Sequence, residues 1–159
     1  AMGAQVVAVD LTEEKLALAK ALGAAVTINA SGGTKVPQAI RDVTGGGAHL
    51  SIDALGHAVT AMNSVRSLRK RGRHVQVGLM LAEHARAAMP MDRVIAYELE
   101  IKGSHGMQAH RYPEMLRMIG AGMLKPEKLV AKTIGLDAAP AALAAMDKFE
   151  GSGITIIRP

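Results

Sequence analysis

The stretch that decides the fold is residues 4–23, AQVVAVDLTEEKLALAKALG, which is typical of a buried strand followed by a helix. Residues 5–9 form a short apolar, β-branched run of the kind found in parallel strands that are covered on both faces. Thr12 fits a helix N-cap, and the two glutamates after it would lie where the helix dipole favours negative charge. Gly23 fits the C-terminal cap, so this stretch predicts a strand–helix unit.

Asp10 lies at the carboxyl end of the predicted strand. In a Rossmann-type domain, an acidic side chain at this place hydrogen-bonds the adenosine ribose of NAD. The alternative is that Asp10 only caps the turn that leads into the helix, because many doubly wound folds carry an acid there. The strand–helix unit by itself leaves both interpretations open.

The composition is that of one globular domain with a sizeable core. The chain has 159 residues, of which 49% are hydrophobic and 21% charged, and this balance argues against disorder. The absence of cysteine excludes disulfides and thiolate metal sites, and it fits the reducing cytoplasm, where we expect the protein to be. No apolar run approaches membrane-spanning length and no signal peptide opens the sequence, so we expect no membrane association.

The net charge of +5 raises the question of nucleic-acid binding. The cations concentrate in residues 66–74, RSLRKRGRH. We interpret this run as the last turn of a helix that ends at Gly72, where positive charge complements the helix dipole. Because no aromatic side chains alternate with the cations to stack on bases, we expect no nucleic-acid partner.

Strands and helices alternate along the rest of the chain. Strands are predicted within residues 25–29, 50–56, 74–79, 99–103, 128–134 and 153–159. Helices are predicted from the apolar positions in residues 36–43, 59–68, 94–95, 112–119 and 138–149. This alternation indicates right-handed crossovers and a doubly wound, mostly parallel α/β sheet.

Three motifs in the middle of the chain resemble one known family. They are residues 53–56 (DALG), residues 71–78 (RGRHVQVG) and residues 102–106 (KGSHG). Their order and spacing, with Asp10 upstream, are similar to the coenzyme-binding portion of the zinc-dependent alcohol dehydrogenases, in the medium-chain dehydrogenase/reductase family. The resemblance covers essentially the whole chain, and it implies a Rossmann-like fold in an oxidoreductase that transfers a hydride between an alcohol and NAD.

The resemblance also implies which residues bind NAD. Asp10 would bind the hydroxyls of the adenosine ribose and repel the 2′-phosphate of NADP, and Lys15 would reach the same ribose. The strand-end residues that would border the nicotinamide half of the coenzyme are Ala54, Leu55, Gly56, Gly78, Leu79, Ser104 and His105. The alternative for the glycines is that they serve only tight turns.

The sequence departs from this family at its beginning. A Rossmann domain starts with a strand and the glycine-rich turn G-x-G-x-x-G, which brings the pyrophosphate to a helix N-terminus, and neither precedes Ala1. The first strand is central in the sheet order 3-2-1-4-5-6, so we expect a gap between the first two strands of this chain and the next three. We also expect the phosphate-binding half of the coenzyme site to be missing.

A second departure concerns the catalytic zinc, whose ligands in this family belong to an N-terminal catalytic domain without a counterpart here. His49 and Asp53 are four residues apart on a predicted strand, which is roughly 13 Å at the rise of a strand and too far for one ion. The other histidines also lack the spacing of a ligand set. We therefore predict no catalytic residue and no metal site in this chain, and no dehydrogenase activity for the chain alone.

The resemblance further suggests two domains and a dimer contact. Residues 1–122 would form a partial Rossmann dinucleotide-binding domain, and residues 123–159 a segment that returns to the absent catalytic domain. Residues 85–90 occupy the place where relatives extend an edge strand to a second subunit, which predicts a homodimer. The alternative is that residues 85–90 form a mobile surface loop.

The sequence therefore predicts the coenzyme-binding fragment of a zinc-type, NAD-dependent alcohol dehydrogenase whose substrates are small alcohols or aldehydes. Two other classes remain open. A Rossmann-type methyltransferase also places an acid after its second strand to hold a ribose, and specific binding of S-adenosylmethionine would favour it. A non-enzymatic NAD-sensing or assembly module would need no catalytic domain, and a gene that begins near Ala1 would favour that class.

Overall fold

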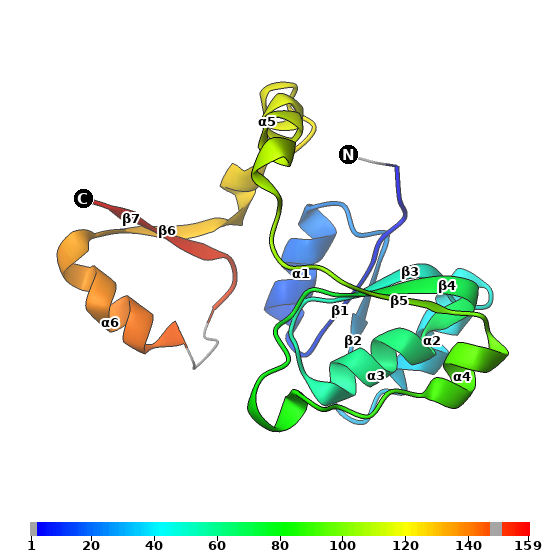
Figure 1. Ribbon diagram of the computed structural model, residues 1–159. Coiled ribbons are helices and arrows are strands. Elements are labelled where there is room, and N and C mark those ends of the chain that lie inside the picture. The colour runs from blue at the N-terminus through cyan, green and yellow to red at the C-terminus, as the bar shows by residue number, and fades with distance from the viewer. Residues whose placement is uncertain (1–2, 147–150) are drawn as a thin grey trace. The chain divides into compact units, whose positions relative to one another are not determined.

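The computed structural model describes residues 3–146 and 151–159, and the chain divides into two compact units (Figure 1). Unit 1 combines Ala1–Thr27 with Gln108–Pro159, and unit 2 consists of Ile28–Met107. The domain boundary after residue 122 rests on the family resemblance, and it stays a prediction.

Unit 2 is built on a parallel sheet of order β3-β4-β5. Its strands are β3 (Ala48–Asp53), β4 (Leu68–Gln76) and β5 (Glu100–Gly103). Its helices are α2 (Val36–Thr44), α3 (Ala58–Arg66) and α4 (Met91–Ala96), with the 3-10 turn η1 (Ala82–His84). Figure 1 shows α3 and α4, which connect β3 to β4 and β4 to β5, on one side of this sheet, as right-handed crossovers in one direction require.

The core of unit 2 lies between the sheet and α3. Ala61, Val65 and Leu68 are almost fully buried there, and the spacing of four between Ala61 and Val65 puts both on one helix face. On β3, by contrast, Leu50 and Ile52 are 51% and 58% exposed. Because side chains alternate along a strand, Ser51 and Asp53 point to the other face of β3, toward α3.

Unit 1 contains both ends of the chain. Its N-terminal elements are β1 (Val7–Asp10), α1 (Glu13–Ala21) and β2 (Val26–Asn29), the last of which crosses into unit 2. Its C-terminal elements are η2 (Ala109–Arg111), α5 (Tyr112–Gly120), η3 (Pro126–Leu129), β6 (Val130–Gly135), η4 (Leu136–Ala138), α6 (Ala139–Ala144) and β7 (Ile154–Arg158). β1 and β2 form one sheet, and β6 and β7 form a separate parallel pair.

The described strands of the predicted Rossmann sheet fall into two separate sheets. β1 and β2 pair with each other, and β3, β4 and β5 form a sheet of their own, so no described strand joins the two sets. The exposure of two valines contradicts the prediction that residues 5–9 form a fully covered strand. Val6 and Val9 are 49% and 40% exposed, and because they are three residues apart they lie on opposite faces, so neither face of this strand is fully covered.

The interpretation of residues 66–74 as the last turn of a helix is wrong. α3 ends at Arg66, and the Ser67 hydroxyl donates to the Asn63 carbonyl over 2.6 Å, which closes the helix earlier than predicted. The basic residues that follow belong to β4. A Cβ on Gly72 would lie 3.1 Å from the carbonyl oxygen of Ala48, so this glycine permits close packing of strands and does not end a helix.

The remaining elements lie where the sequence predicts them, with shifts of a few residues at their ends. The predicted helix of residues 138–149 is described as α6 up to Ala144, and residues 147–150 of it lie outside the described residues. Residues 85–90 form no strand within this single chain. None of the helices in the described part of the chain is long and apolar enough to cross a bilayer.

Candidate functional site

The carboxyl ends of β3, β4 and β5 lie in one row. Asp53 pairs in register with Gln76, and Gln76 pairs with Gly103. The segments that leave this row are Ala54–Gly56, Val77–Leu79 and Ser104–His105. Unit 2 therefore brings together all the residues predicted to border the nicotinamide, at the sheet edge where doubly wound folds bind ligands.

The loops after β3 and β4 are in direct backbone contact. The amides of Val77 and Gly78 both donate to the carbonyl of Asp53 over 2.9 Å. A Cβ on Gly78 would overlap the backbone nitrogen of Gly56, and a Cβ on Gly56 would overlap the carbonyl of Leu79. Gly56 also has a φ of 85°, which favours glycine. The contact between the two loops thus explains both glycines without a coenzyme.

Asp53 organises the loop that follows it. Its side chain is only 3% exposed, and Oδ1 accepts hydrogen bonds from the amide of Leu55 over 2.9 Å and of Gly56 over 3.2 Å. The Thr60 hydroxyl of α3 donates to the same oxygen over 3.1 Å. Burial alone raises the pKa of the Asp53 carboxyl, but the hydrogen bonds from Gln76, the two amides and Thr60 outweigh it and hold the pKa below its ordinary value. Asp53 is therefore a carboxylate at neutral pH.

Ser104 and His105 follow β5 and are exposed. The amide of Ser104 donates to the carbonyl of Gln76 over 2.9 Å, which continues the sheet pairing by one residue past Gly103. The third segment of this edge is therefore held by the backbone of β4, while its side chains remain available to a ligand.

Asp10 and Lys15 belong to unit 1. Oδ1 of Asp10 accepts hydrogen bonds from the amides of Leu11 over 2.7 Å and Thr12 over 3.1 Å, so this carboxylate does cap the turn before α1. Thr12 precedes α1 as predicted, but its hydroxyl lies 3.4 Å from Oδ1 of Asp10 and does not cap the helix. Oδ2 of Asp10 takes part in none of these contacts. Lys15 is half-buried and lies in the first turn of α1.

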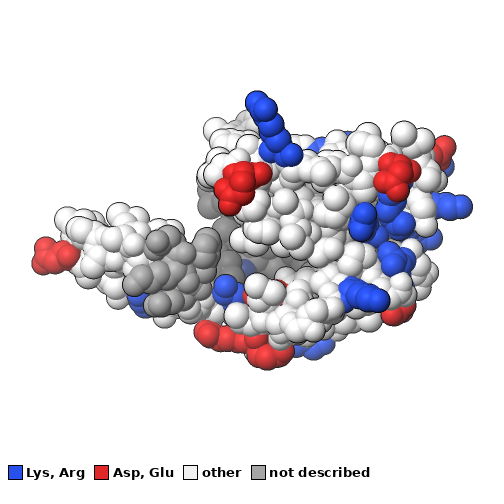
Figure 2. Space-filling view, turned by 90° about the horizontal axis from the view of Figure 1, so that it is seen from below, with Lys and Arg blue, Asp and Glu red and all other residues white. Residues whose placement is uncertain are grey.

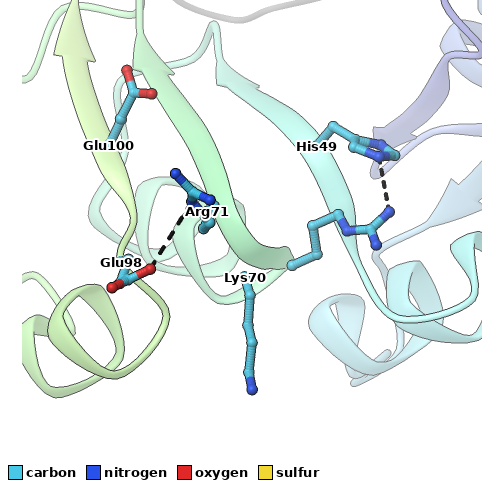
Figure 3. A pocket seen from close by; sticks show the side chains of 6 residues that line it. His49, Lys70, Arg71, Glu98 and Glu100 are labelled. Atoms are coloured by element: carbon cyan, nitrogen blue, oxygen red, sulfur yellow. Dashed lines mark hydrogen bonds and ion pairs between the residues drawn. The ribbon is translucent and has the colours of Figure 1, made fainter.

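A shallow pocket lies at the opposite, amino-terminal edge of the sheet in unit 2. It is lined by His49, Arg69, Lys70, Arg71, Glu98 and Glu100. Figure 3 shows Arg71 directed at Glu98, at 4.0 Å, and His49 next to the guanidinium of Arg69, at 2.8 Å, while Lys70 extends away from both pairs. This pocket contains none of the predicted coenzyme residues, and its Glu100 pairs with Arg73 and Lys102, which lie outside the lining.

On the face that Figure 2 presents, several Lys and Arg side chains gather at the right, with Asp and Glu side chains beside them. The prediction that the protein has no nucleic-acid partner stays a prediction. No group of three or more His, Cys, Asp or Glu within residues 3–146 and 151–159 is arranged to hold a metal ion. The zinc implied by the resemblance therefore does not fit the residues described.

Sequence reasoning missed two residues at this edge, Gln76 and Thr60. Gln76 stands between Val75 and Val77 in the strand predicted within residues 74–79, and a polar side chain between two valines was the available signal. Thr60 gives no comparable signal, because a threonine in the first turn of a helix is common.

The parallel sheet, its crossovers and the loops at its carboxyl edge define the class as a Rossmann-like α/β fold. A family model described as zinc-binding dehydrogenase matches residues 1–121, so the chain belongs to that family. The resemblance drawn from the motifs and the predicted α/β fold are thereby confirmed.

Individual relatives agree with this assignment. The chain is 31% identical over 157 residues to an NAD-dependent alcohol dehydrogenase of Sulfurisphaera tokodaii. The match covers 99% of this chain and 44% of the relative. It is 31% identical over 129 residues to an erythritol/L-threitol dehydrogenase of Mycolicibacterium smegmatis, covering 79% of this chain and 34% of the relative. The chain thus spans less than half the length of these curated relatives.

Solved structures of similar fold include two dehydrogenases. The crystal structure of an NAD-dependent alcohol dehydrogenase matches with a TM-score of 0.87 and 28% identity, over 99% of this chain and 44% of that one. The 2R,3R-butanediol dehydrogenase of Bacillus subtilis matches with a TM-score of 0.85 and 26% identity, over 98% of this chain and 44% of that one.

Proposed function

We propose that this chain is the coenzyme-binding portion of an NAD-dependent, zinc-type alcohol dehydrogenase. The observation that carries the proposal is the row of strand ends at Asp53, Gln76 and Gly103, from which three loops leave the sheet at one edge. Membership of the zinc-binding dehydrogenase family and the printed names of the relatives support the same coenzyme and reaction class.

The nicotinamide half of NAD would be held by unit 2. The backbone contact between Gly56 and Gly78 holds the loops after β3 and β4 together, and the two loops would border the ring as one unit. Ser104 and His105, after β5, would complete the border through the backbone or side-chain groups that remain free. When bound, the nicotinamide ring accepts or donates the hydride, and these residues only hold and orient it.

The adenosine half of NAD would be held by unit 1. Asp10 uses Oδ1 for its own turn, which fixes the carboxylate and leaves Oδ2 to accept from a ribose hydroxyl. A fixed negative charge at this position disfavours the 2′-phosphate of NADP. Lys15 lies in the first turn of α1 and would reach the same ribose.

The substrate chemistry belongs to the whole protein of which this chain would be a part. We propose small alcohols or aldehydes as substrates, a cytoplasmic location, and a homodimer that pairs through residues 85–90. Because the described residues do not fit a zinc ion, no catalytic step is assigned to them, and the chain alone is proposed to be inactive.

The test uses half-ligands, because the two sets of residues lie in different units. Amide NMR shifts would be followed during titration with AMP and with nicotinamide mononucleotide. We expect AMP to shift residues near Asp10 and Lys15, and nicotinamide mononucleotide to shift residues 54–56, 78–79 and 104–105. The proposal would be contradicted if AMP, nicotinamide mononucleotide and NAD all failed to shift these residues. Specific shifts with S-adenosylmethionine in place of NAD would support the methyltransferase alternative.

A further inference from the structure

A hydrogen-bonded network of polar side chains lies between the sheet and α3 in unit 2. Its most buried member is His74 on β4, which is 0% exposed, and its other end is Asp53, which is 3% exposed. Gln76 lies between these two residues and contacts both. Burying this many polar groups costs free energy unless each one is hydrogen-bonded, so their partners can be followed one by one.

The contacts of Gln76 are specific. Its Nε2 lies 2.8 Å from Oδ2 of Asp53 and 2.9 Å from the carbonyl oxygen of Gly78. Its Oε1 lies 3.2 Å from Nε2 of His74. On the far side of the imidazole, Nδ1 of His74 lies 3.0 Å from the hydroxyl of Ser64 and 3.4 Å from that of Ser51.

These contacts determine where each proton lies. The carboxylate of Asp53 and the carbonyl of Gly78 only accept hydrogen bonds, so the amide nitrogen of Gln76 must face them as the donor. The amide oxygen then faces His74 and only accepts, so Nε2 of His74 carries the proton. Nδ1 is left as the acceptor, and the Ser64 hydroxyl donates to it. The charge of Asp53 therefore sets the tautomer of a histidine two hydrogen bonds away.

The same amide ties the two loops of the carboxyl edge together. Nε2 of Gln76 donates to the Asp53 carboxylate, which accepts from the amides of Leu55 and Gly56. The same nitrogen donates to the Gly78 carbonyl and so holds the loop after β4. A glutamine on a strand interior is thus connected to both segments that carry the proposed nicotinamide contacts.

We infer that Gln76 is a positioning residue of the coenzyme edge, which locks the loops after β3 and β4 together and fixes buried His74 as the Nε2-protonated tautomer. The role in coenzyme binding rests on the proposed function, whereas the lock and the tautomer do not. Gln76 itself touches neither the coenzyme nor the substrate in this account. It acts through Asp53 and Gly78.

The first measurement is made on the unaltered chain. Nitrogen-15 NMR of the imidazole rings reads the tautomer of His74 directly, and we expect Nε2 to be protonated and Nδ1 to be unprotonated. Protonation at Nδ1, or a mixture of both tautomers, would overturn the inference without any variant having to fold.

The second measurement compares variants by amide hydrogen exchange at Leu55 and Gly56. Gln76→Leu removes the amide, and we expect exchange at both positions to become about tenfold faster or more, as the loss of a buried hydrogen bond predicts. Gln38→Leu is the matched control, because Gln38 is an exposed amide on α2 that bridges Asp42 and Arg41. Unchanged exchange in Gln76→Leu would overturn the lock.

Gln76→Glu separates positioning from mere packing. The glutamate has almost the shape of the glutamine, but when ionised it cannot donate to Asp53, and the two carboxylates repel. As the pH falls, the pair takes up one shared proton and a donor reappears between them. Because the intrinsic exchange rate itself falls with pH, we compare protection factors, which are exchange rates relative to the unprotected amide at the same pH. We expect the protection of Leu55 and Gly56 to rise at acid pH in this variant alone, and equally low protection at both pH values would contradict the role of the donor.

The link to coenzyme binding is tested last, with nicotinamide mononucleotide as the probe. We expect its Kd to rise about tenfold in Gln76→Leu and to stay unchanged in Gln38→Leu. An unchanged Kd in Gln76→Leu would overturn the positioning role. If the unaltered chain shows the predicted tautomer and slow exchange but binds neither this probe nor NAD, the proposed function fails while the lock stands.

Discussion

Nε2 of Gln76 lies 2.8 Å from Oδ2 of Asp53, and this contact joins the carboxyl ends of β3 and β4 through side chains as well as backbone. The Asp53 carboxylate completes its hydrogen bonding within its own loop and α3. A buried, ionised and fully partnered carboxylate of this kind is costly to disturb, because each partner loses its acceptor when the carboxylate changes.

Asp53→Asn should lower the free energy of unfolding by about 1–3 kcal/mol, because an amide group would turn a donor toward groups that already donate. The measurement is urea denaturation of the chain. Asp42→Asn on α2 is the control, since Asp42 is exposed and accepts a hydrogen bond from the side chain of Gln38. Equal effects of the two substitutions would contradict the role of Asp53.

Gly78→Ala should lower the free energy of unfolding by about 1–3 kcal/mol, since the added Cβ would overlap the backbone of Gly56 and push the two loops apart. Gly103→Ala is the matched control at the end of the neighbouring strand. Nothing lies within 4 Å of a Cβ at Gly103, so that variant should stay within about 0.5 kcal/mol of the unaltered chain. A neutral Gly78→Ala would show that the loops do not touch.

Stability should fall in two steps as the pH is lowered. Burial lowers the pKa of His74 below its ordinary value of 6.5, despite opposing effects of Gln76 and Asp53. The unfolded chain therefore takes up a proton there before the folded chain does, and the free energy of unfolding declines from about pH 6.5 downward. Asp53, whose pKa lies below its ordinary value of 3.8, adds a further decline below that pH.

The first step is checked by following the His74 ring in an NMR titration, whose midpoint should lie below pH 6.5, together with urea denaturation at pH 7 and pH 5. His110→Asn provides the control, because His110 is exposed and its removal should leave the pH dependence unchanged. A free energy of unfolding that is higher at pH 5 than at pH 7 would contradict the lowered pKa of His74.

Asp10→Asn should weaken AMP binding by roughly tenfold while leaving the fold intact, because the amide oxygen can still accept from Leu11 and Thr12 but the negative charge is gone. The same variant should bind adenosine 2′,5′-bisphosphate better than the unaltered chain does, since the carboxylate no longer repels the 2′-phosphate. Asp137→Asn, an exposed acid in the same unit, is the control. If Asp10→Asn prefers AMP over adenosine 2′,5′-bisphosphate as strongly as the unaltered chain does, Asp10 caps the turn and does not bind the ribose.

Local patterns in the sequence were enough for the order and type of the elements. The alternation of apolar runs and helical periods around residues 4–23 predicted β1 and α1, and the same reasoning located β3, β4 and β5. The error at residues 66–74 arose because a cluster of cations suits the end of a helix and the start of a strand equally well. The pairing of β4 with β3 decides between them, and that pairing joins residues far apart in the sequence.

The sequence by itself determined the family, the parallel α/β order and the acids and glycines at the strand ends, because these depend on residues close to one another in the chain. Only the tertiary structure decided that Gly56 touches Gly78 and that Gln76 connects Asp53 to His74. Asp53 and Gln76 are 23 residues apart. Their contact depends on the register of two parallel strands, which is set by packing against α3 and leaves no trace in either strand alone.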